Sequence, residues 1–292
     1  MSVDRLQEKI RKCKNPSIVE FDADYSAIPG CVLEEECAKD RAYLHYCGEL
    51  LEILKGLIPG VRFSFGNFAL KGSEGLSLLE DLTKLAHQMG YYVLLDAPVA
   101  YSEKEAQSGA LILMGEDCRW YCDGVIVNSY IGADAIKPYA QYITEEEKSL
   151  FVVLRTGNKT GPQLQDLLTG GRLVHTALAD VVSRIGQTCM GRRNYSNVCC
   201  VSAANAADSL QTLRKKYPKQ FLMVEGYDYS NANAKNCSYA FDAMGHGAVV
   251  CAGDSVVAAW REGGETNPDY RQAALEAAER MRKNLLRYIT VL

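Results

Sequence analysis

The chain has 292 residues, of which 48% are hydrophobic and 23% are charged, a composition that is ordinary for a globular protein. Its formal net charge is −4 and its pI is near 5.7, with charges of both signs interspersed along the sequence. We therefore expect no nucleic-acid partner, because a polyanion is bound through a basic surface.

The first segment predicts a short amphipathic helix at about residues 3–12. Its charged and apolar residues recur at helical spacing, and it lacks both the apolar core and the small-residue cleavage site of a signal peptide. No apolar stretch approaches the roughly 18 residues that are needed to span a bilayer. We expect a soluble, cytoplasmic protein without a membrane partner.

Eight short apolar runs follow one another along the chain, with helical patterns between them. They cover residues 18–22, 61–65, 91–95, 125–127, 151–154, 198–201, 221–224 and 248–251. The runs are continuous rather than alternating, as expected of parallel strands whose outer face is covered by helices. They predict an α/β fold, a single-domain (β/α)8 TIM barrel over residues 1–292, with a C-terminal helix at about 268–288.

Local signals mark the starts of several intervening helices. Ser73 precedes an apolar series with helical spacing, and Ser102 with Glu105 has the form of a capping box. Asn205 is placed to open the helix that follows the sixth run. These signals support the alternation of strand and helix without relying on hydrophobicity alone.

The cysteines are many but do not form a recognisable metal site. The chain has eleven of them, none in a C-x-x-C motif, and several lie inside apolar runs, where reduced thiols pack as small hydrophobic groups. Cys118 and Cys122 are the nearest approach to a metal-binding pair, but no second pair or suitably spaced histidine accompanies them. We interpret the cysteines as reduced thiols of the core.

The C-terminal ends of the strands, where barrels of this kind carry their chemistry, are unusually polar. Asp22 and Asp96 directly follow apolar runs, and a carboxylate at a barrel mouth needs partners or solvent, so we interpret both as site residues. Other strand ends provide candidate ligand-binding residues, although some of them could serve only as turn formers or helix caps. These candidates are Asn128, Thr156, Glu225, Gly226 and Asp254.

Four stretches of the chain resemble the longer, bacterial-type orotidine 5'-phosphate decarboxylases, in the same order and at the same spacing. They are VDRLQEKIRKCKNPSIVEFDAD, DGVIVNSYIGADAIKPY, VVLRTGNKTGPQLQDL and FLMVEGYDYSNAN. The resemblance covers nearly the whole chain. It implies a barrel, a carboxy-lyase of pyrimidine biosynthesis and a homodimer formed by the segments after the third and fourth strands. An apolar helix face there carries Ala106, Ala110, Leu111 and Met114.

The resemblance also assigns positions to the catalytic residues. In that family an aspartate ends the first strand, a lysine lies in the second, and the third closes with D-x-K-x-x-D. Asp22 and Asp96 match the two strand-end aspartates, and Arg62 stands at the second-strand lysine. Pro98 stands at the proton-donating lysine and Tyr101 at the aspartate that reaches the neighbouring subunit's site. The motif is therefore degraded.

The missing groups are those that the family's reaction requires. Decarboxylation leaves a very basic carbanion, which needs a positioned ammonium to protonate it, and proline supplies neither proton nor charge. The guanidinium of Arg62 is a very poor proton donor, and Lys104 occupies a capping-box position that points to solvent. At the phosphate end, Asp254 stands where the family has an arginine and Glu225 where it has a proline.

We therefore predict a catalytically degenerate relative of the decarboxylases, which acts as a binding or regulatory protein or on an unphosphorylated small molecule that the sequence does not name. The alternative is a working orotidine 5'-phosphate decarboxylase with relocated groups, such as Lys104 or Arg62. Another alternative is a lyase or hydrolase reaction that uses the carboxylates at the strand ends. These carboxylates are Asp22, Asp96, Glu225 and Asp254.

A third possibility treats the acidic strand ends as ligands of magnesium or manganese. The residues concerned are Asp22, Asp24, Asp96, Asn128 and Asp254. No histidine lies at any of the eight strand ends to make such a site specific. We rank this possibility last, and we predict neither a metal ion nor another cofactor.

Overall fold

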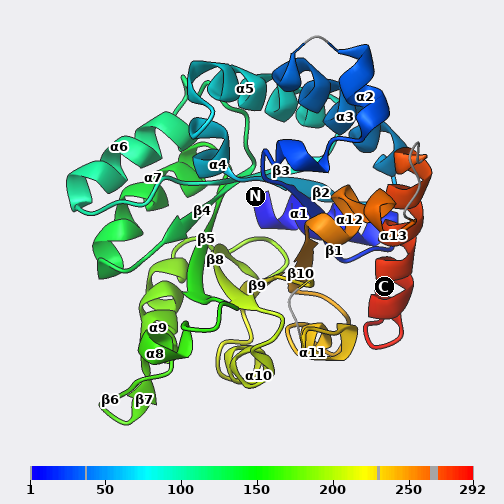
Figure 1. The fold of residues 1–292 in the computed structure, drawn as a ribbon. Helices are drawn as coiled ribbons and strands as arrows, with labels where there is room; N and C mark the ends of the chain where they lie inside the picture. The colour runs from blue at the N-terminus through cyan, green and yellow to red at the C-terminus, as the bar shows by residue number, and fades with distance from the viewer. Residues whose placement is uncertain (1, 37, 229–230, 264–268, 292) are drawn as a thin grey trace.

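The computed structural model describes residues 2–36, 38–228, 231–263 and 269–291. Eight parallel strands close into a barrel in the order β1-β10-β9-β8-β5-β4-β3-β2, with helices around it (Figure 1). These strands are β1 (Ser17–Phe21), β2 (Gly60–Phe63), β3 (Tyr92–Asp96), β4 (Gly124–Asn128), β5 (Ser149–Arg155), β8 (Ser196–Ala203), β9 (Gln220–Glu225) and β10 (Ala248–Ala252). The predicted (β/α)8 barrel is confirmed, and each predicted run overlaps one of these strands.

The connections between strands contain the helices that cover the barrel. The longer helices are α3 (Lys39–Leu54), α5 (Gly72–Gln88), α6 (Glu103–Met114), α7 (Lys137–Glu145), α9 (Val174–Gly186), α10 (Ala207–Lys216) and α13 (Tyr270–Leu286). The short ones are α2 (Gly30–Glu35), α4 (Phe65–Ala69), α8 (Pro162–Gln165), α11 (Ala234–Ser238), α12 (Asp254–Val257) and the 3-10 turns η1 (Tyr25–Ala27), η2 (Gly132–Ala135) and η3 (Ala259–Gly263). A small antiparallel hairpin outside the barrel, β6 (Leu168–Thr169) with β7 (Arg172–Leu173), was not predicted. No helix in the described ranges is long and apolar enough to cross a membrane.

The helix starts agree with the sequence signals only in part. Ser102 caps α6, because its Oγ accepts a hydrogen bond from the Glu105 N–H at 3.3 Å. Asn205 does not cap α10, since its side chain instead donates to the Gly157 carbonyl at 2.9 Å. Ser73 lies inside the first turn of α5 rather than before it. The predicted C-terminal helix is α13, and residue 268 lies outside the described residues.

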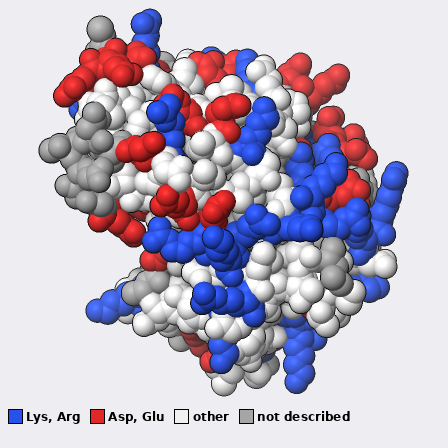
Figure 2. All heavy atoms as spheres, turned by 90° about the vertical axis from the view of Figure 1, so that its right-hand side faces the viewer, with Lys and Arg blue, Asp and Glu red and all other residues white. Residues whose placement is uncertain are grey.

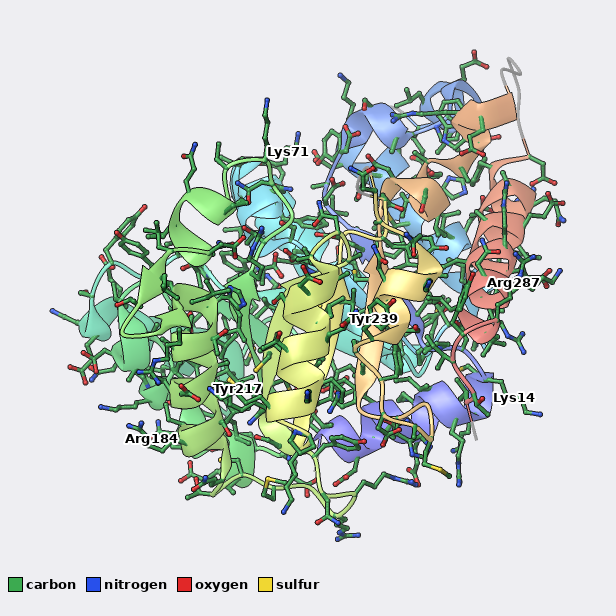
Figure 3. All side chains as sticks on the ribbon, turned by 90° about the horizontal axis from the view of Figure 1, so that it is seen from below. Lys14, Lys71, Arg184, Tyr217, Tyr239 and Arg287 are labelled. Carbon is green, nitrogen blue, oxygen red and sulfur yellow. The ribbon has the colours of Figure 1, made fainter. Side chains whose placement is uncertain are left out.

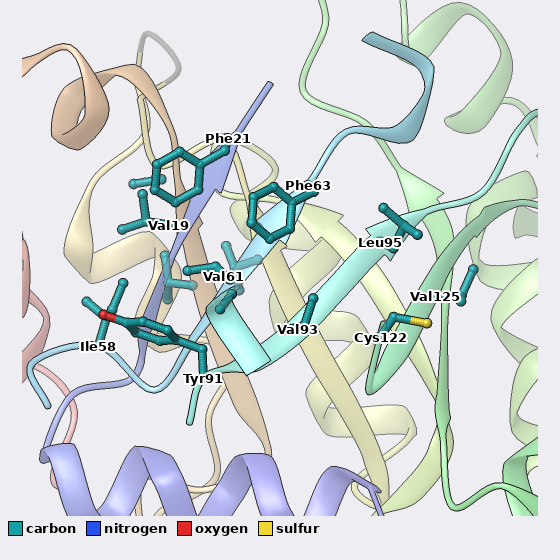
Figure 4. Packing of buried hydrophobic residues seen from close by; sticks show 14 of the residues in the cluster. Val19, Phe21, Ile58, Val61, Phe63, Tyr91, Val93, Leu95, Cys122 and Val125 are labelled. Atoms are coloured by element: carbon teal, nitrogen blue, oxygen red, sulfur yellow. The ribbon is translucent and has the colours of Figure 1, made fainter. Parts of the chain in front are cut away.

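Alternation along the strands divides the core into an outer and an inner layer. The outward side chains pack beneath the helices, and Figure 4 shows part of this layer between β1 and β4. Its members there include Val19, Phe21, Val61, Phe63, Val93, Leu95 and Val125. The inward side chains form a second apolar cluster that fills the barrel. Its members include Ile18, Tyr92, Leu94, Ile126, Phe151, Phe221, Met223, Val249 and Cys251.

Helix α1 (Ser2–Cys13) closes the N-terminal end of the barrel, and it corresponds to the helix predicted at 3–12. Val3, Leu6 and Ile10 are buried in the same cluster as the inward strand residues. Ser2 Oγ lies 2.6 Å from the Tyr92 hydroxyl. In the side view of Figure 3, Lys14, just after α1, and Lys71, between α4 and α5, lie at opposite ends of the barrel. The end that remains open is therefore the one where the strands terminate.

Candidate functional site

The last inward-facing position of each of four strands, at its C-terminal end, carries a charged side chain instead of an apolar one. Glu20 continues the inward series of Ile18 on β1, and Arg62 lies beside it on β2, where the two residues are register partners. Asp96 ends β3 and Glu225 ends β9. Because successive residues of a strand face opposite sides, the same alternation that fills the barrel with apolar groups places these four charges at its open end.

Arg62 is the centre of this group. Its Nε and Nη2 donate to the two carboxylate oxygens of Asp96 at 2.9 and 2.8 Å, which is the bidentate geometry of a strong ion pair. Its Nη1 lies 3.3 Å from Glu20 Oε2 and 3.9 Å from Glu225 Oε2. The Arg62 side chain is only 12% exposed, so three carboxylates hold one nearly buried cation.

Burial and the neighbouring charges shift the pKa values of these side chains. Burial raises the pKa of Glu20 to about 7, against the lowering effect of Arg62 and with help from neighbouring carboxylates. Burial also raises the pKa of Glu225, although Arg62 opposes the shift. Burial by itself lowers the pKa of Arg62, but Asp96 and Glu20 outweigh it and hold that pKa above its ordinary value. Glu20 is thus the group that gains or loses a proton near neutral pH.

The four charges face a cavity of about 380 Å³ at the C-terminal ends of the strands. Its lining residues are Glu20, Asp22, Arg62, Asn67, Glu225, Gly226, Asp228, Cys251, Gly253 and Asp254. Five carboxylates and one guanidinium line this space, which leaves a formal charge of −4 when all of them are ionised. Burial raises the pKa of Asp254, and the nearby Asp22 and Asp24 raise it further. The mouth of the barrel is therefore strongly acidic.

The backbone around the cavity adopts conformations that fix the acidic groups. Ala23 has a φ of 59°, in the left-handed region that residues with a Cβ rarely adopt, and its N–H donates to the Tyr43 hydroxyl at 3.0 Å. Asp22 accepts a hydrogen bond from the Asp24 N–H at 3.1 Å. The Gly253 N–H donates to Asp228 at 2.7 Å. The loops after β1, β9 and β10 are thus held by local hydrogen bonds.

Most of the residues predicted from the strand ends meet at this cavity. Asp22, Arg62, Glu225, Gly226 and Asp254 line it, and Asp96 is joined to it through Arg62. The other two ligand-binding candidates lie elsewhere.

Asn128 is exposed, and its side-chain oxygen accepts a hydrogen bond from the Tyr130 N–H at 3.0 Å. Thr156 is engaged with Gln165, whose side chain accepts the Thr156 N–H at 2.9 Å. Neither residue lines the cavity, and these hydrogen bonds join each of them to a nearby part of the chain.

The positions that the resemblance marks as degraded lie at the surface. Pro98 is exposed and Tyr101 is 80% exposed, and neither lines the cavity. Lys104 is exposed in the first turn of α6, as expected for its place after the cap. No lysine lines the cavity among the described residues.

Several residues of the site were not predicted from the sequence. Glu20 belongs to a run that was treated as apolar, and Cys251 to another. Asn67, Asp228 and Gly253 also line the cavity and were not among the candidates predicted from the sequence. The signal that could have identified Glu20 is its even spacing from Ile18 and Asp22, which puts all three on the inward face.

The acidic residues considered as magnesium or manganese ligands do not lie together as such a site would require. Asp96 gives both of its oxygens to Arg62, and Asn128 lies outside the cavity. Asp24 turns to Ser26, accepting from its N–H at 2.9 Å and its hydroxyl at 2.7 Å. Within the described ranges, no group of three or more His, Cys, Asp or Glu side chains is arranged to hold a metal ion.

Comparison with known proteins finds orotidine 5'-phosphate decarboxylases that are similar to this chain. No family model matches the chain. The orotidine 5'-phosphate decarboxylase of Rhodopirellula baltica is 29% identical over 220 residues, which cover 74% of this chain and 73% of the relative. That of Clostridium acetobutylicum is 26% identical over 294 residues, which cover 98% and 100% of the two chains.

Solved structures give the same result for the fold. The OMP decarboxylase of Leishmania donovani superimposes with a TM-score of 0.71 at 22% identity, covering 98% of this chain and 99% of that one. The orotidine 5'-monophosphate decarboxylase of Plasmodium berghei gives 0.75 at 13% identity, covering 98% of both chains. The resemblance seen in the sequence is confirmed: the chain is homologous to orotidine 5'-phosphate decarboxylases and has their barrel.

Proposed function

We propose that this chain is a divergent homologue of the decarboxylases that does not decarboxylate orotidine 5'-phosphate, and that its barrel mouth binds an unphosphorylated ligand. One observation carries the proposal. Arg62, the only lysine or arginine among the described residues that line the cavity, is already paired with Asp96 and bordered by Glu20 and Glu225. The described lining residues therefore leave no unpaired Lys or Arg side chain for an anionic substrate.

The chemistry of proton transfer supports the loss of the reaction. A carbanion formed by loss of CO2 must be protonated by a group whose pKa lies within reach of the solvent pH. Asp96 and Glu20 hold the pKa of Arg62 above its ordinary value, which makes an already poor donor worse. Lys104 lies exposed on α6 and does not line the cavity.

The charge of the cavity supports the loss of phosphate binding. Asp254 stands where the family has an arginine, and Asp22 and Asp228 line the same space. Two like charges about 4 Å apart at an effective dielectric constant of roughly 20 repel by about 4 kcal/mol, less whatever solvent screens. A phosphate monoester would meet this repulsion, whereas a neutral or cationic ligand would not.

Calorimetric titration with uridine 5'-monophosphate, with and without magnesium, tests the proposal. We expect no binding in either condition, because the repulsion is not compensated by any free cation of the site. Asp254→Asn is the matched variant, and it should leave this result unchanged because other carboxylates remain. Micromolar binding without metal would refute the proposal, and binding only with magnesium would favour a metal-dependent site instead.

A second candidate is acid–base chemistry on an unphosphorylated ligand, and one observation favours it. Glu20, with its pKa raised to about 7, could exchange a proton with a bound molecule near neutral pH. Its carboxylate lines the cavity beside Asp22. Where the chain turns over an unphosphorylated ligand, Glu20→Gln should abolish that turnover. A rate equal to that of the wild-type chain would show that Glu20 is not the acid or base.

The assembly that we propose is a homodimer formed by the segments that follow β3 and β4. These segments carry apolar side chains at the surface, namely Val99, Tyr101, Leu111, Ile112 and Tyr130. The interface expected from the sequence was partly wrong, because Ala106, Ala110 and Met114 are buried in the chain's own core. Leu111, 62% exposed, is the one member of that face that points outward.

A further inference from the structure

Two cysteine side chains and a lysine meet at the end of the barrel opposite the cavity. Cys118 and Cys122 lie between α6 and β4, and Lys148 lies just before β5. Both sulfur atoms are 3.1 Å from the Leu113 carbonyl oxygen. Lys148 Nζ is 3.4 Å from the same oxygen and 3.9 Å from Cys122 Sγ. One carbonyl near the end of α6 therefore gathers two thiols and an ammonium.

The two thiols differ in exposure and in acidity. Cys122, which Figure 4 shows near Val125, is 2% exposed, whereas Cys118 is partly exposed to solvent. A hydrogen bond from Cys122 lowers the pKa of Cys118 to about 7, and the Lys148 ammonium also lowers it. The same hydrogen bond, together with burial, raises the pKa of Cys122. One thiol is accessible and acidic, and its neighbour is protected and protonated.

We propose that Cys118 and Cys122 form a peroxide-sensitive dithiol site, in which Cys118 is the thiol that reacts and Cys122 the thiol that resolves the product. The inference rests on the shared carbonyl, the adjacent ammonium and the difference in access between the two sulfur atoms. It is independent of the function proposed for the barrel mouth, because it uses none of those residues.

The reaction balances with a hydroperoxide as the oxidant. The Cys118 thiolate attacks one peroxide oxygen, the O–O bond breaks, and the leaving alkoxide or hydroxide takes up a proton, so that Cys118 becomes a sulfenic acid. Cys122 sulfur then attacks the sulfenic sulfur. The S–S bond forms as the S–O bond breaks, and the departing hydroxide leaves as water with the proton of Cys122. The peroxide is reduced and the two thiols are oxidised to one disulfide.

Several other cysteines among the described residues lack this combination. Cys199, Cys200 and Cys251 are buried in the barrel, and burial raises the pKa of each thiol. Cys13 is partly exposed, but burial raises its pKa in spite of nearby lysines. Cys13 is therefore a suitable control, because its thiol is partly exposed but its pKa is not lowered.

In the test, the 292-residue chain is treated with hydrogen peroxide, the remaining thiols are blocked and tryptic peptides are analysed by mass spectrometry. Trypsin cleaves after Arg119, which separates the two cysteines, so the disulfide joins two peptides that are otherwise released apart. We expect this linked pair to form first among the cysteine peptides and to disappear on treatment with a thiol reductant. Oxidation of other cysteines without this link would overturn the proposal.

Single variants separate the two roles. Cys122→Ser should stop the reaction at a sulfenic acid on Cys118, which a dimedone adduct detects, and Cys118→Ser should leave Cys122 reduced. Lys148→Met should slow the first step several-fold while keeping the methylene stem in place. Cys13→Ser should leave the rate unchanged. Equal oxidation of Cys122 in the Cys118→Ser variant, or a rate that depends on Cys13, would contradict the assigned roles.

Discussion

At the scale of single residues, the site depends on one guanidinium that holds several carboxylates. Arg62 is nearly buried, and Asp96, Glu20 and Glu225 all approach it. A buried ion pair adds little net stability compared with apolar groups, but removing one partner leaves the others charged and desolvated. Replacing such a residue should therefore lower the free energy of unfolding.

Arg62→Met should lower the free energy of unfolding by about 3–5 kcal/mol near neutral pH, because three carboxylates lose their counter-ion. The loss should shrink in acid, where the carboxylates take up protons. Denaturant unfolding at two pH values measures both effects. Arg119→Met is the control, since its ion pair with Glu80 lies at the surface and should contribute little to stability. Equal losses in the two variants would contradict the account.

Glu20 should make the stability depend on pH in a defined direction. Its folded-state pKa is about 7 and its ordinary value is 4.5, so the folded chain keeps a proton that the unfolded chain has already lost. The stabilisation is present below the lower value and is lost as the pH rises through about 7. Glu20→Gln cannot ionise at this position, so the variant should lack the part of the stability loss that Glu20 causes.

The wild-type protein should lose on the order of 3 kcal/mol relative to Glu20→Gln as the pH rises from about 4 to about 8. Unfolding curves for both proteins across this range provide the measurement. Parallel pH profiles would show that Glu20 ionises normally.

The sequence located some of these residues and not others for a physical reason. Asp22 and Asp96 stand after apolar runs, and Arg62 was identified through the family resemblance, so all three were found. Glu20 lies within a strand, where a single charge does not interrupt the apolar pattern enough to be noticed. Its role follows only from the partners that the barrel brings to it, and a linear sequence does not give that contact.

At the scale of elements, α1 determines which end of the barrel is open. Its apolar face lies in the cluster formed by the inward strand residues, and its first residues bond to the strands and loops of that end. The helical spacing of apolar residues predicted this helix but not its position in the fold. The same amphipathic pattern would suit a helix on the outside of the barrel.

Leu6→Ala should destabilise the fold by about 2–5 kcal/mol, because it leaves a cavity between α1 and the barrel. Leu6 is completely buried. Arg11→Ala, on the exposed side of the same helix, should change the free energy of unfolding by less than about 0.5 kcal/mol. A loss for Leu6→Ala no larger than that for Arg11→Ala would show that α1 does not seal the barrel.

Element boundaries depended on interactions that the sequence does not show. The strands were found because continuous apolar runs are a strong signal, whereas the role of Asn205 was assigned wrongly since its side chain bonds to the distant Gly157. The β6–β7 hairpin was missed because its two-residue strands are too short to show a pattern.

At the scale of the whole molecule, charge and apolar surface are unevenly distributed. Figure 2 shows Lys and Arg side chains forming a band across the face that carries α13, with acidic side chains gathered above it. Arg271, Arg280, Lys283 and Arg287 of this region are exposed. The apolar side chains after β3 and β4 lie in another part of the chain, which is where we propose the dimer contact.

Leu111→Glu should convert the proposed homodimer to a monomer, because it would bury a charge in an apolar contact. Light scattering across a range of protein concentrations measures the change. Tyr288→Glu provides the control, since Tyr288 is 55% exposed in the segment that follows α13 and should not affect assembly. A wild-type monomer at micromolar concentration would contradict the dimer, and a Leu111→Glu dimer would contradict this interface.

We propose above all that the barrel has kept its architecture and lost the decarboxylation. The most direct test incubates the purified chain with orotidine 5'-phosphate and follows the loss of substrate absorbance, with an active decarboxylase assayed beside it. We predict no turnover above the background without protein, and no recovery in the Pro98→Lys/Tyr101→Asp double variant, because phosphate binding is lost as well. Turnover by the wild-type chain that Lys104→Ala or Glu20→Gln abolishes would contradict the account.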